Sequence, residues 1–512
     1  MLSRVRSAAV VGIDAVMIDV EVDLANGLPC MNVVGLAENA VREGRERVAS
    51  ALHNSGFQIP PKRITINLAP ADLPKTGSAF DLPIAIGLLA ATRVLPSDPA
   101  GVCLLGELGL DGELRPVRGV LSAAMRCRED GITRMIVPYA NAREAGVIAG
   151  LDVIPADTLR QVVDVLRGTT RIDPVRVSLE VAMRETAIAH DVDFSDVQGQ
   201  TLAKRALEVA AAGFHNLLMI GPPGAGKSML ARRLSTILPP LTADEALDVT
   251  RVHSVAGRLR PGQAVVSQRP FRAPHHTTSD AGLVGGGTSP RPGEVSLAHH
   301  GVLFLDEFPE FRKHVLEALR QPLEDGVSVI GRARNSVTYP ARFMLAAAMN
   351  PCPCGYYGDG VGRCVCTANQ VERYAARISG PLLDRIDLHI HVPALAPEHL
   401  TAKESGESSA AIRERVVAAR DRQLRRFQGR PQLYANAHMS PRDVRAYCKV
   451  PADAESLLRS AMQRLGLSAR AYHRVLRLSR TIADLDDAET IRAEHVAEAI
   501  QYRSLDRRTR LP

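Results

Sequence analysis

The sequence contains no tryptophan, and aromatic residues make up only 4% of its 512 residues. Its hydrophobic cores must therefore depend mainly on aliphatic side chains. It also lacks an uninterrupted apolar run of about 18 residues, so no membrane-spanning helix is expected. Asp14 and Asp19 interrupt the apolar stretch near the start, and no small-residue cleavage site follows. We therefore reject a signal peptide and expect a cytoplasmic protein.

Length and charge limit the architecture and the partners. A chain of this length exceeds one ordinary core, so two or three domains are expected. The formal net charge of +7 permits a polyanionic partner without requiring one. The patterning predicts an α/β protein with a mixed N-terminal domain over 1–167, a linker over 168–192, a parallel-sheet module over 193–397 and a helical lid over 398–512.

The clearest motif is NLLMIGPPGAGKSMLARRL, in which a strand runs into a glycine-rich loop and then a helix. It has the form G-x-x-x-x-G-K-[ST], whose backbone N–H groups surround phosphate oxygens at a helix N-terminus. We expect Lys227 to reach the β- and γ-phosphates and Ser228 to ligate Mg²⁺. The predicted ATP-binding residues are Gly221, Pro222, Pro223, Gly224, Ala225, Gly226, Lys227, Ser228, Met229 and Asp306.

Two later strands end in polar residues. The strand in HHGVLFLDEFPEF ends at Asp306 and Glu307. Asp306 is expected to hold Mg²⁺ through water, and Glu307 to polarise the attacking water. An acidic pair at this position could instead cap the next helix. The strand in ARFMLAAAMN ends at Asn350, which can contact the γ-phosphate and the attacking water.

Two arginines follow these strands in the sequence and complete the set of candidate site residues. Arg385 lies in SGPLLDRIDLHIHV, and Arg470 opens the helix in GLSARAYHRVLRLSRTIADL. Over about residues 193 to 512 the chain resembles the AAA+ ATPases, with Walker A, Walker B, sensor 1, arginine finger and sensor 2 in sequence. The resemblance implies that Arg385 enters the neighbouring subunit's site, and that Arg470 acts within its own subunit. Arg474 and Arg477 share the last helix, so the sensor 2 position could be displaced by a turn.

Two further segments narrow the resemblance. LEDGVSVIGRARNSVTYPARFML predicts a hairpin with Arg332 and Arg334 at its tip, and a longer insert precedes the acidic strand. Such inserts resemble those of the magnesium-chelatase and MCM-helicase branch, where they face the pore of a ring. Arginines there suit a DNA phosphate backbone, although a solvated turn is the simpler reading. The histidine pairs at 275–276 and 299–300 are expected to belong to the insert and to packing rather than to a metal site.

The N-terminal block, with LPKTGSAFDLPIAIGLLAA, resembles the Lon-protease-type domain. Ser78 falls at or beside the nucleophile position, but the position of the required lysine is apolar, near Leu121. We therefore expect a protease-like fold without protease activity. The order of the domains resembles the ComM/YifB family of magnesium-chelatase-like ATPases, which implies a ring-forming, DNA-dependent motor.

Four of the eight cysteines lie in MNPCPCGYYGDGVGRCVCTANQ, as two C-x-C pairs. Cys352, Cys354, Cys364 and Cys366 could supply the four thiolates of a tetrahedral Zn²⁺ site. The alternatives left open are an iron–sulfur cluster, a disulfide pair and free buried thiols. The metal would stiffen the path between the ATP site and Arg385 without joining the chemistry.

Together these features predict an ATP- and Mg²⁺-dependent, homo-oligomeric DNA motor: a hexameric helicase or branch-migration translocase. The main alternative is a chaperone-like or chelatase-type ring that remodels a protein partner. An ATP-dependent protease is disfavoured because the lysine of the dyad is missing. No membrane partner is expected.

Overall fold

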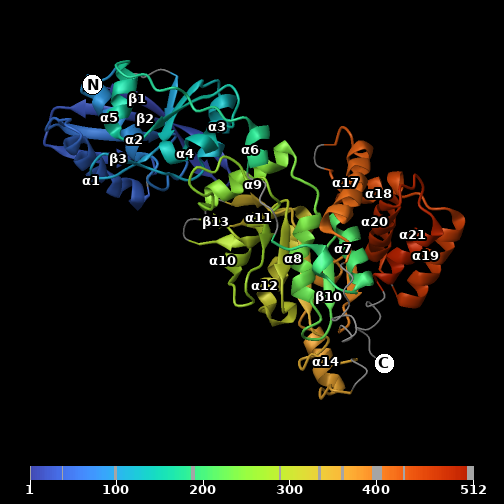
Figure 1. Cartoon of the computed structure of the whole chain (residues 1–512). Coiled ribbons are helices and arrows are strands. Elements are labelled where there is room, and N and C mark those ends of the chain that lie inside the picture. Colours follow the sequence, from blue (N-terminus) through green and yellow to red (C-terminus); the bar gives the residue numbers. More distant parts are fainter. Residues whose placement is uncertain are drawn as a thin grey trace.

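The computed structural model describes residues 2–36, 38–96, 101–185, 191–287, 290–331, 336–358, 362–394, 406–430, 433–466 and 468–503. The chain forms a row of three units, with the N-terminal unit at one end and a helical C-terminal unit at the other (Figure 1). The predicted hairpin tip with Arg332 and Arg334 lies outside the described residues. In the described part of the chain, no helix is long and apolar enough to cross a membrane.

The N-terminal unit is built on a mixed seven-stranded sheet with the order β3-β4-β2-β1-β5-β8-β9. Its strands are β1 (Leu2–Val11), β2 (Asp14–Ala25), β3 (Cys30–Val34), β4 (Arg63–Ala69), β5 (Val102–Leu104), β8 (Arg134–Pro138) and β9 (Asp152–Ala156), and a small hairpin joins β6 (Glu107–Leu108) to β7 (Leu114–Arg115). Within the seven-stranded sheet, the β1–β2 and β2–β4 pairs are antiparallel and the other pairs are parallel.

Helices cover this sheet: α1 (Asn39–Asn54), α2 (Asp81–Ala91), α3 (Val120–Glu129), α4 (Tyr139–Ala145) and α5 (Leu159–Arg167). The sequence of α2, DLPIAIGLLAA, is apolar all round after its first residue, as expected of a helix in a core. All eleven of its residues are buried, and it packs against β1 and β2. In β4 every second residue is buried, the period of a strand with one face on a core.

The segment predicted as a linker is not a free spacer in its described part. Val175 pairs with Val153 as an isolated bridge, and α6 (Leu179–Glu185) follows. Ala182 of α6 belongs to a core cluster that also includes Val249 of the next unit. The Gly119 N–H donates to Ser254 Oγ over 3.0 Å across the same junction. The two units are therefore docked through shared apolar and polar contacts.

The middle unit is built on a parallel five-stranded sheet with the order β11-β14-β17-β10-β18. Its strands are β10 (Leu217–Ile220), β11 (Phe271–Arg272), β14 (Val302–Leu305), β17 (Met344–Met349) and β18 (Leu388–His391). The surrounding helices are α7 (Thr201–Gly213), α8 (Lys227–Ile237), α9 (Ala243–Ala256), α12 (Lys313–Ala318), α13 (Arg320–Asp325), α14 (Ala368–Ala375) and α15 (Gly380–Leu383), with 3₁₀ turns η1 (Phe194–Asp196) and η2 (Phe308–Glu310). All residues of β14 and β17 are buried, which explains their continuous apolar runs.

Two excursions leave this sheet. The first contains α10 (Asp280–Leu283), β12 (Gly285–Gly286), β13 (Arg291–Pro292) and α11 (Glu294–Leu297). The second is the predicted hairpin, in which β15 (Val327–Ile330) pairs antiparallel with β16 (Val337–Pro340). The hairpin prediction is confirmed by this pairing.

The C-terminal unit is helical, as predicted. It contains α17 (Ser409–Arg426), η3 (Asn436–His438), α18 (Pro441–Tyr447), α19 (Ala452–Leu465), α20 (Ala469–Leu485) and α21 (Ala493–Gln501). Helix α17 packs against α7 and α8, so the lid shares one hydrophobic core with the sheet. The α/β fold class is confirmed.

Candidate functional site

The predicted phosphate loop joins β10 to α8 at the carboxyl edge of the sheet. Two of its glycines have steric reasons to be glycine. A Cβ on Gly221 would lie 2.1 Å from the Val392 carbonyl oxygen, and Gly226 has a φ of +86°, a conformation that side chains disfavour. The loop therefore keeps the open backbone that phosphate binding requires.

Lys227 and Asn350 meet inside this loop. The Lys227 ammonium donates to the carbonyl oxygens of Gly221 and Pro222 over 2.7 Å and 2.9 Å, and to Asn350 Oδ1 over 3.1 Å. Burial lowers the pKa of Lys227, and the nearby Asp306 carboxylate opposes this shift. Strands β10 and β17 are neighbours, so their carboxyl ends bring the predicted phosphate ligand and sensor together.

The acidic pair follows β14 at the same edge. Ser228 Oγ donates to Asp306 Oδ2 over 2.5 Å, so a hydroxyl and a carboxylate that could hold Mg²⁺ lie at one point. The Glu307 carboxylate is about half exposed and lies 3.0 Å from His276 Nδ1. Glu307 therefore projects into solvent beside the loop, where an attacking water would stand.

Arg385 and Arg470 lie together, away from the phosphate loop. The Arg385 guanidinium is buried and contacts the Glu324 carboxylate, whose other oxygen is 3.9 Å from Arg470. Both arginines line one cavity of about 710 Å³ with Asn216 and Asp387. These two residues immediately precede β10 and β18, so the cavity marks the amino edge of the sheet.

This placement bears on the expectation that Arg470 acts within its own subunit. The phosphate loop follows β10, and Arg470 lies near its beginning, so a strand of roughly 13 Å separates them. An action of Arg470 on its own subunit's ATP does not fit this arrangement. Arg474 of the same helix pairs with Asp387 over 2.9 Å at the same edge, so a shift of one turn does not change the conclusion.

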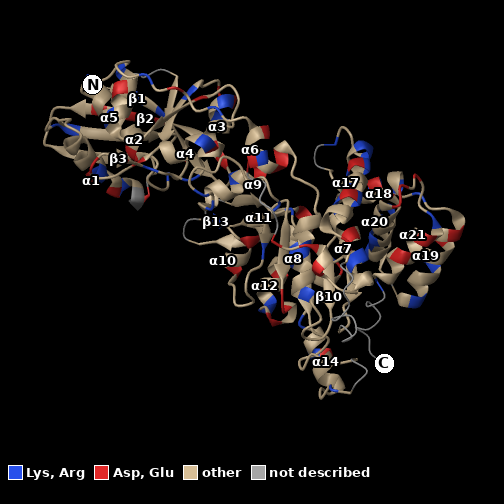
Figure 2. Cartoon of the chain, in the orientation of Figure 1, with Lys and Arg blue, Asp and Glu red and all other residues tan. Residues whose placement is uncertain are grey.

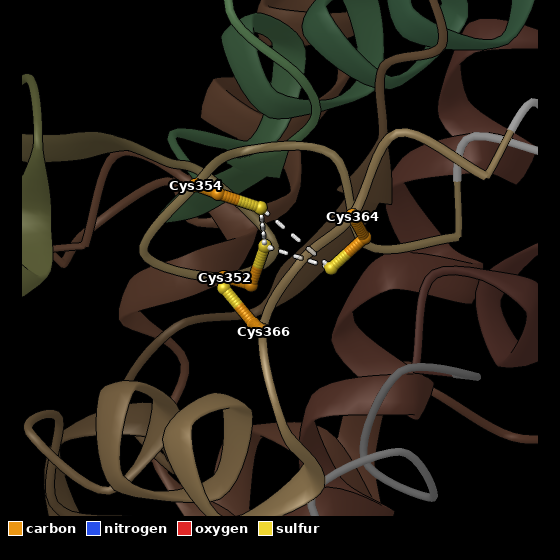
Figure 3. Close-up of side chains that lie close together, drawn as sticks. All are labelled: Cys352, Cys354, Cys364 and Cys366. Carbon is orange, nitrogen blue, oxygen red and sulfur yellow. Dashed lines mark hydrogen bonds between the residues drawn. The ribbon is translucent and has the colours of Figure 1, made fainter.

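The four cysteines after β17 form a compact cluster (Figure 3). The Sγ atom of Cys352 is 3.3 Å from that of Cys354 and 3.8 Å from that of Cys364, and all four sulfurs lie within 4.8 Å of one another. Backbone N–H groups of Tyr356 and Val365 lower the pKa of the Cys354 thiol to about 6. The cluster thus offers four converging sulfurs.

A second group of possible ligands is less suited to a cation. Asp248, His299 and His300 also converge. However, the Arg342 backbone N–H donates to His299 Nδ1, and burial together with Arg269 lowers the pKa of His300 to about 2. Nearby guanidinium groups disfavour a cation at this place, and the assignment of these histidines to packing stays a prediction.

In the N-terminal unit, Ser78 donates a hydrogen bond to the Glu107 carboxylate. Leu121 is fully buried in α3. The absence of protease activity remains a prediction that rests on this apolar residue at the expected lysine position.

Comparisons with known proteins agree with this architecture. Residues 193–400 match the family model described as magnesium chelatase, subunit ChlI; residues 20–141 match subunit ChlI of Mg-chelatase, and residues 406–503 match the ChlI C-terminal model. The chain is 47% identical to the YifB protein of Salmonella typhimurium and 46% identical to that of Escherichia coli. It is 45% identical to the competence protein ComM of Haemophilus influenzae. Each match spans 99% of this chain and 98% of the relative.

The chain belongs to the ComM/YifB family. Its chelatase-type AAA+ module implies ATP hydrolysis, and hence ATP and Mg²⁺ as ligands. Chelatase-type AAA+ proteins are typically oligomeric.

Within this ComM/YifB chain, the sequence analysis did not predict three contacts of candidate site residues, made by His276, Glu324 and Gly355. Each acts through a contact distant in sequence, with Glu307, Arg385 and Pro223 respectively. The adjacent histidines and the glycines of the cysteine loop could be recognised in the sequence, but neither pattern predicts which residue it contacts. Glu324 carried no signal in the sequence.

Proposed function

We propose that this protein is an ATP-driven ring motor that acts on DNA, as a hexameric helicase or branch-migration translocase in recombination or natural transformation. One observation carries the proposal: the phosphate loop and the Arg385–Arg470 pair occupy opposite edges of one sheet. A complete ATP site then needs the loop of one subunit and the arginines of the next. Such head-to-tail contacts generate rings when the rotation closes.

On this proposal, each residue of the ATP site has a specific role. Lys227 and the loop N–H groups hold the phosphates, while Ser228 and Asp306 hold Mg²⁺. Glu307 orients the attacking water, and Asn350 contacts the γ-phosphate. Arg385 and Arg470 stabilise charge on the neighbouring subunit's ATP.

DNA as the substrate is supported by the similarity to a competence protein and by a local cluster of arginines. In the view of Figure 2, basic and acidic residues are interspersed over all three units. At the junction of the first two units, however, burial and the charges of Arg291 and Arg258 lower the pKa of Arg118. In the described part of the chain, no ion pair joins these three arginines to a carboxylate.

The position of Arg118 in this arginine cluster depends on Gly257. Gly257 ends α9 with a φ of +67°, and a Cβ there would lie 2.7 Å from Arg118 Nε. Without a side chain at this point, Arg118 of the N-terminal unit can lie against the middle unit beside Arg258. Strand β13, which contains Arg291, packs against α9. Three guanidinium groups from three segments suit successive phosphates of a backbone.

Zn²⁺ is the proposed occupant of the cysteine cluster. Zn–S bonds of about 2.3 Å in a tetrahedron place sulfurs roughly 3.8 Å apart. The three Sγ–Sγ separations among Cys352, Cys354 and Cys364 are 3.3, 3.6 and 3.8 Å, close to that value. Zn²⁺ would tie the two C-x-C pairs together and play no part in hydrolysis.

ATP turnover measured with single-stranded, duplex and branched DNA tests the proposal. We expect DNA to stimulate turnover, and Arg258→Ala with Arg291→Ala to weaken that stimulation and its salt dependence. Arg459→Ala is the matched control, because Arg459 is an exposed arginine on α19 that pairs only locally with Glu455. Turnover that no DNA stimulates would refute the DNA motor and favour the remodeller of a protein partner, which the chelatase matches also support.

A further inference from the structure

The cysteine cluster packs directly on the phosphate loop. Gly355 follows Cys354, and its N–H donates to the Cys352 carbonyl oxygen over 3.0 Å, which closes a tight turn. Gly355 has a φ of +88°, and a Cβ there would lie 2.6 Å from Cδ and 2.7 Å from Cγ of Pro223. Pro223 stands in the middle of the phosphate loop. The turn that carries two of the cysteines therefore lies against the Pro223 ring, within the loop that would bind phosphate.

Both ends of the cysteine segment are also fixed to the ATP machinery. Asn350, which accepts a hydrogen bond from Lys227, lies two residues before Cys352. After Cys366 the chain enters α14, where the Asn350 backbone lies close enough to the Tyr374 hydroxyl to lower its pKa, against the larger rise caused by burial. Just beyond α14, Arg377 donates to Glu310 Oε2 over 2.7 Å, close to Glu307. The cysteine segment therefore contacts residues that follow β10, β14 and β17, the three strands whose ends form the site.

We propose that metal bound by the four cysteines sets the affinity of the phosphate loop for ATP through the Gly355–Pro223 contact. The inference rests on the metal site proposed above. Metal ties Cys352 and Cys354 to Cys364 and Cys366, which orders the turn at Gly355. The ordered turn holds Pro223, and with it the loop N–H groups, in the geometry that receives phosphate.

Because metal binding and ATP binding would be thermodynamically linked, each must affect the other equally. If metal raises ATP affinity by some factor, ATP raises metal affinity by the same factor. Couplings between sites in proteins are typically about 5- to 150-fold. The cysteine cluster would therefore act as a metal-responsive control on nucleotide binding, and the metal would be retained best when ATP is bound.

Two glycines of the same loop provide a matched pair of variants. Gly358 has a φ of +76°, similar to that of Gly355, but nothing lies within 4 Å of a Cβ built there. Gly355→Ala and Gly358→Ala therefore carry similar backbone strain, and only the first disturbs Pro223. In zinc-loaded full-length protein we expect Gly355→Ala to raise the Kd for a fluorescent ATP analogue about fivefold or more. Gly358→Ala should leave it within about twofold, with one zinc retained in both.

The reciprocal measurement follows zinc transfer to a chromogenic chelator, with and without a non-hydrolysable ATP analogue and Mg²⁺. The nucleotide should slow transfer and lower its extent in the parent protein. Lys227→Ala, which lacks the phosphate ligand, should show no protection. Zinc bound but unaffected by nucleotide, or equal Kd values for the two glycine variants, would overturn the inference while leaving the metal site intact. Protein that binds no zinc would overturn both.

Discussion

Rings that contain two kinds of mutant subunit can establish which residues of one ATP site come from different subunits. Lys227→Ala removes the phosphate ligand and leaves both arginines, whereas Arg385→Ala leaves the phosphate loop and removes one arginine. If each site pairs one loop with the next subunit's arginines, a random one-to-one mixture leaves about one quarter of the interfaces intact. Loss of an arginine finger costs about 10³ to 10⁵ in rate, so the defective interfaces contribute almost nothing.

Mixtures that contain Arg470→Ala subunits show whether Arg470 acts on its own subunit's ATP or on its neighbour's. Because it shares the amino edge of the sheet with Arg385, mixing Lys227→Ala with Arg470→Ala subunits should also restore about one quarter of the activity. Mixing Arg385→Ala with Arg470→Ala subunits should restore none, since every interface then lacks one arginine. If Arg470 served its own subunit, these two outcomes would be exchanged.

The assay is phosphate release per ring, on complexes purified through two different affinity tags so that every ring is mixed. Native mass spectrometry gives the subunit ratio by which the expected quarter is corrected. Recovery in the Arg385→Ala and Arg470→Ala mixture would refute the shared-edge reasoning. No recovery in either mixture that contains Lys227→Ala, despite proven mixing, would refute a role between subunits.

Three further outcomes are expected. Lys227→Ala should abolish ATP binding and turnover, whereas Glu307→Gln should keep ATP binding, measured by filter retention, and lose turnover; turnover at the parent rate would contradict the assigned role of Glu307. Protein purified without chelator should contain about one zinc per chain by elemental analysis, and freely reactive thiols with no zinc would contradict the metal site. Replacing Arg332 and Arg334 together by Ala should flatten the slope of log DNA affinity against log salt, to which each phosphate contact contributes about 0.7 to 0.9; an unchanged slope with unchanged DNA stimulation would exclude them as DNA contacts.

The sequence was sufficient where one local pattern determines both structure and chemistry. The strand–loop–helix at Lys227, the buried strand ending at Asp306 and the strand ending at Asn350 each predict a backbone and a function from consecutive residues. Parallel strands carry their carboxyl ends to one edge, so these side chains had to meet once the strands were neighbours. The cysteine cluster was predictable for a similar reason, since Cys352, Cys354, Cys364 and Cys366 lie on one short loop.

The sequence was insufficient where the outcome depends on how units dock. A helix start predicts Arg470 at the N-terminus of α20, but the docking of the lid decides which edge of the sheet it reaches. The contacts of His276 with Glu307 and of Gly355 with Pro223 join segments whose separation in sequence carries no pattern. The segment around Val175 looked like a spacer because its apolar residues lack a period, yet they pack on the N-terminal sheet and its neighbour.

The position of Glu324 suggests how assembly and catalysis would be coupled in the proposed motor. A buried guanidinium such as that of Arg385 is costly without an anionic partner, and Glu324 supplies one within the subunit. The phosphates of a neighbouring ATP carry more negative charge and can replace it. On this proposal Arg385 would exchange one anion for another when subunits meet around ATP, and most of its desolvation would precede the arrival of the neighbour. Forming an interface would then require only that the Arg385 guanidinium change its anionic partner from Glu324 to phosphate. This arrangement is compatible with rapid cycling between ATP-bound and ATP-free interfaces.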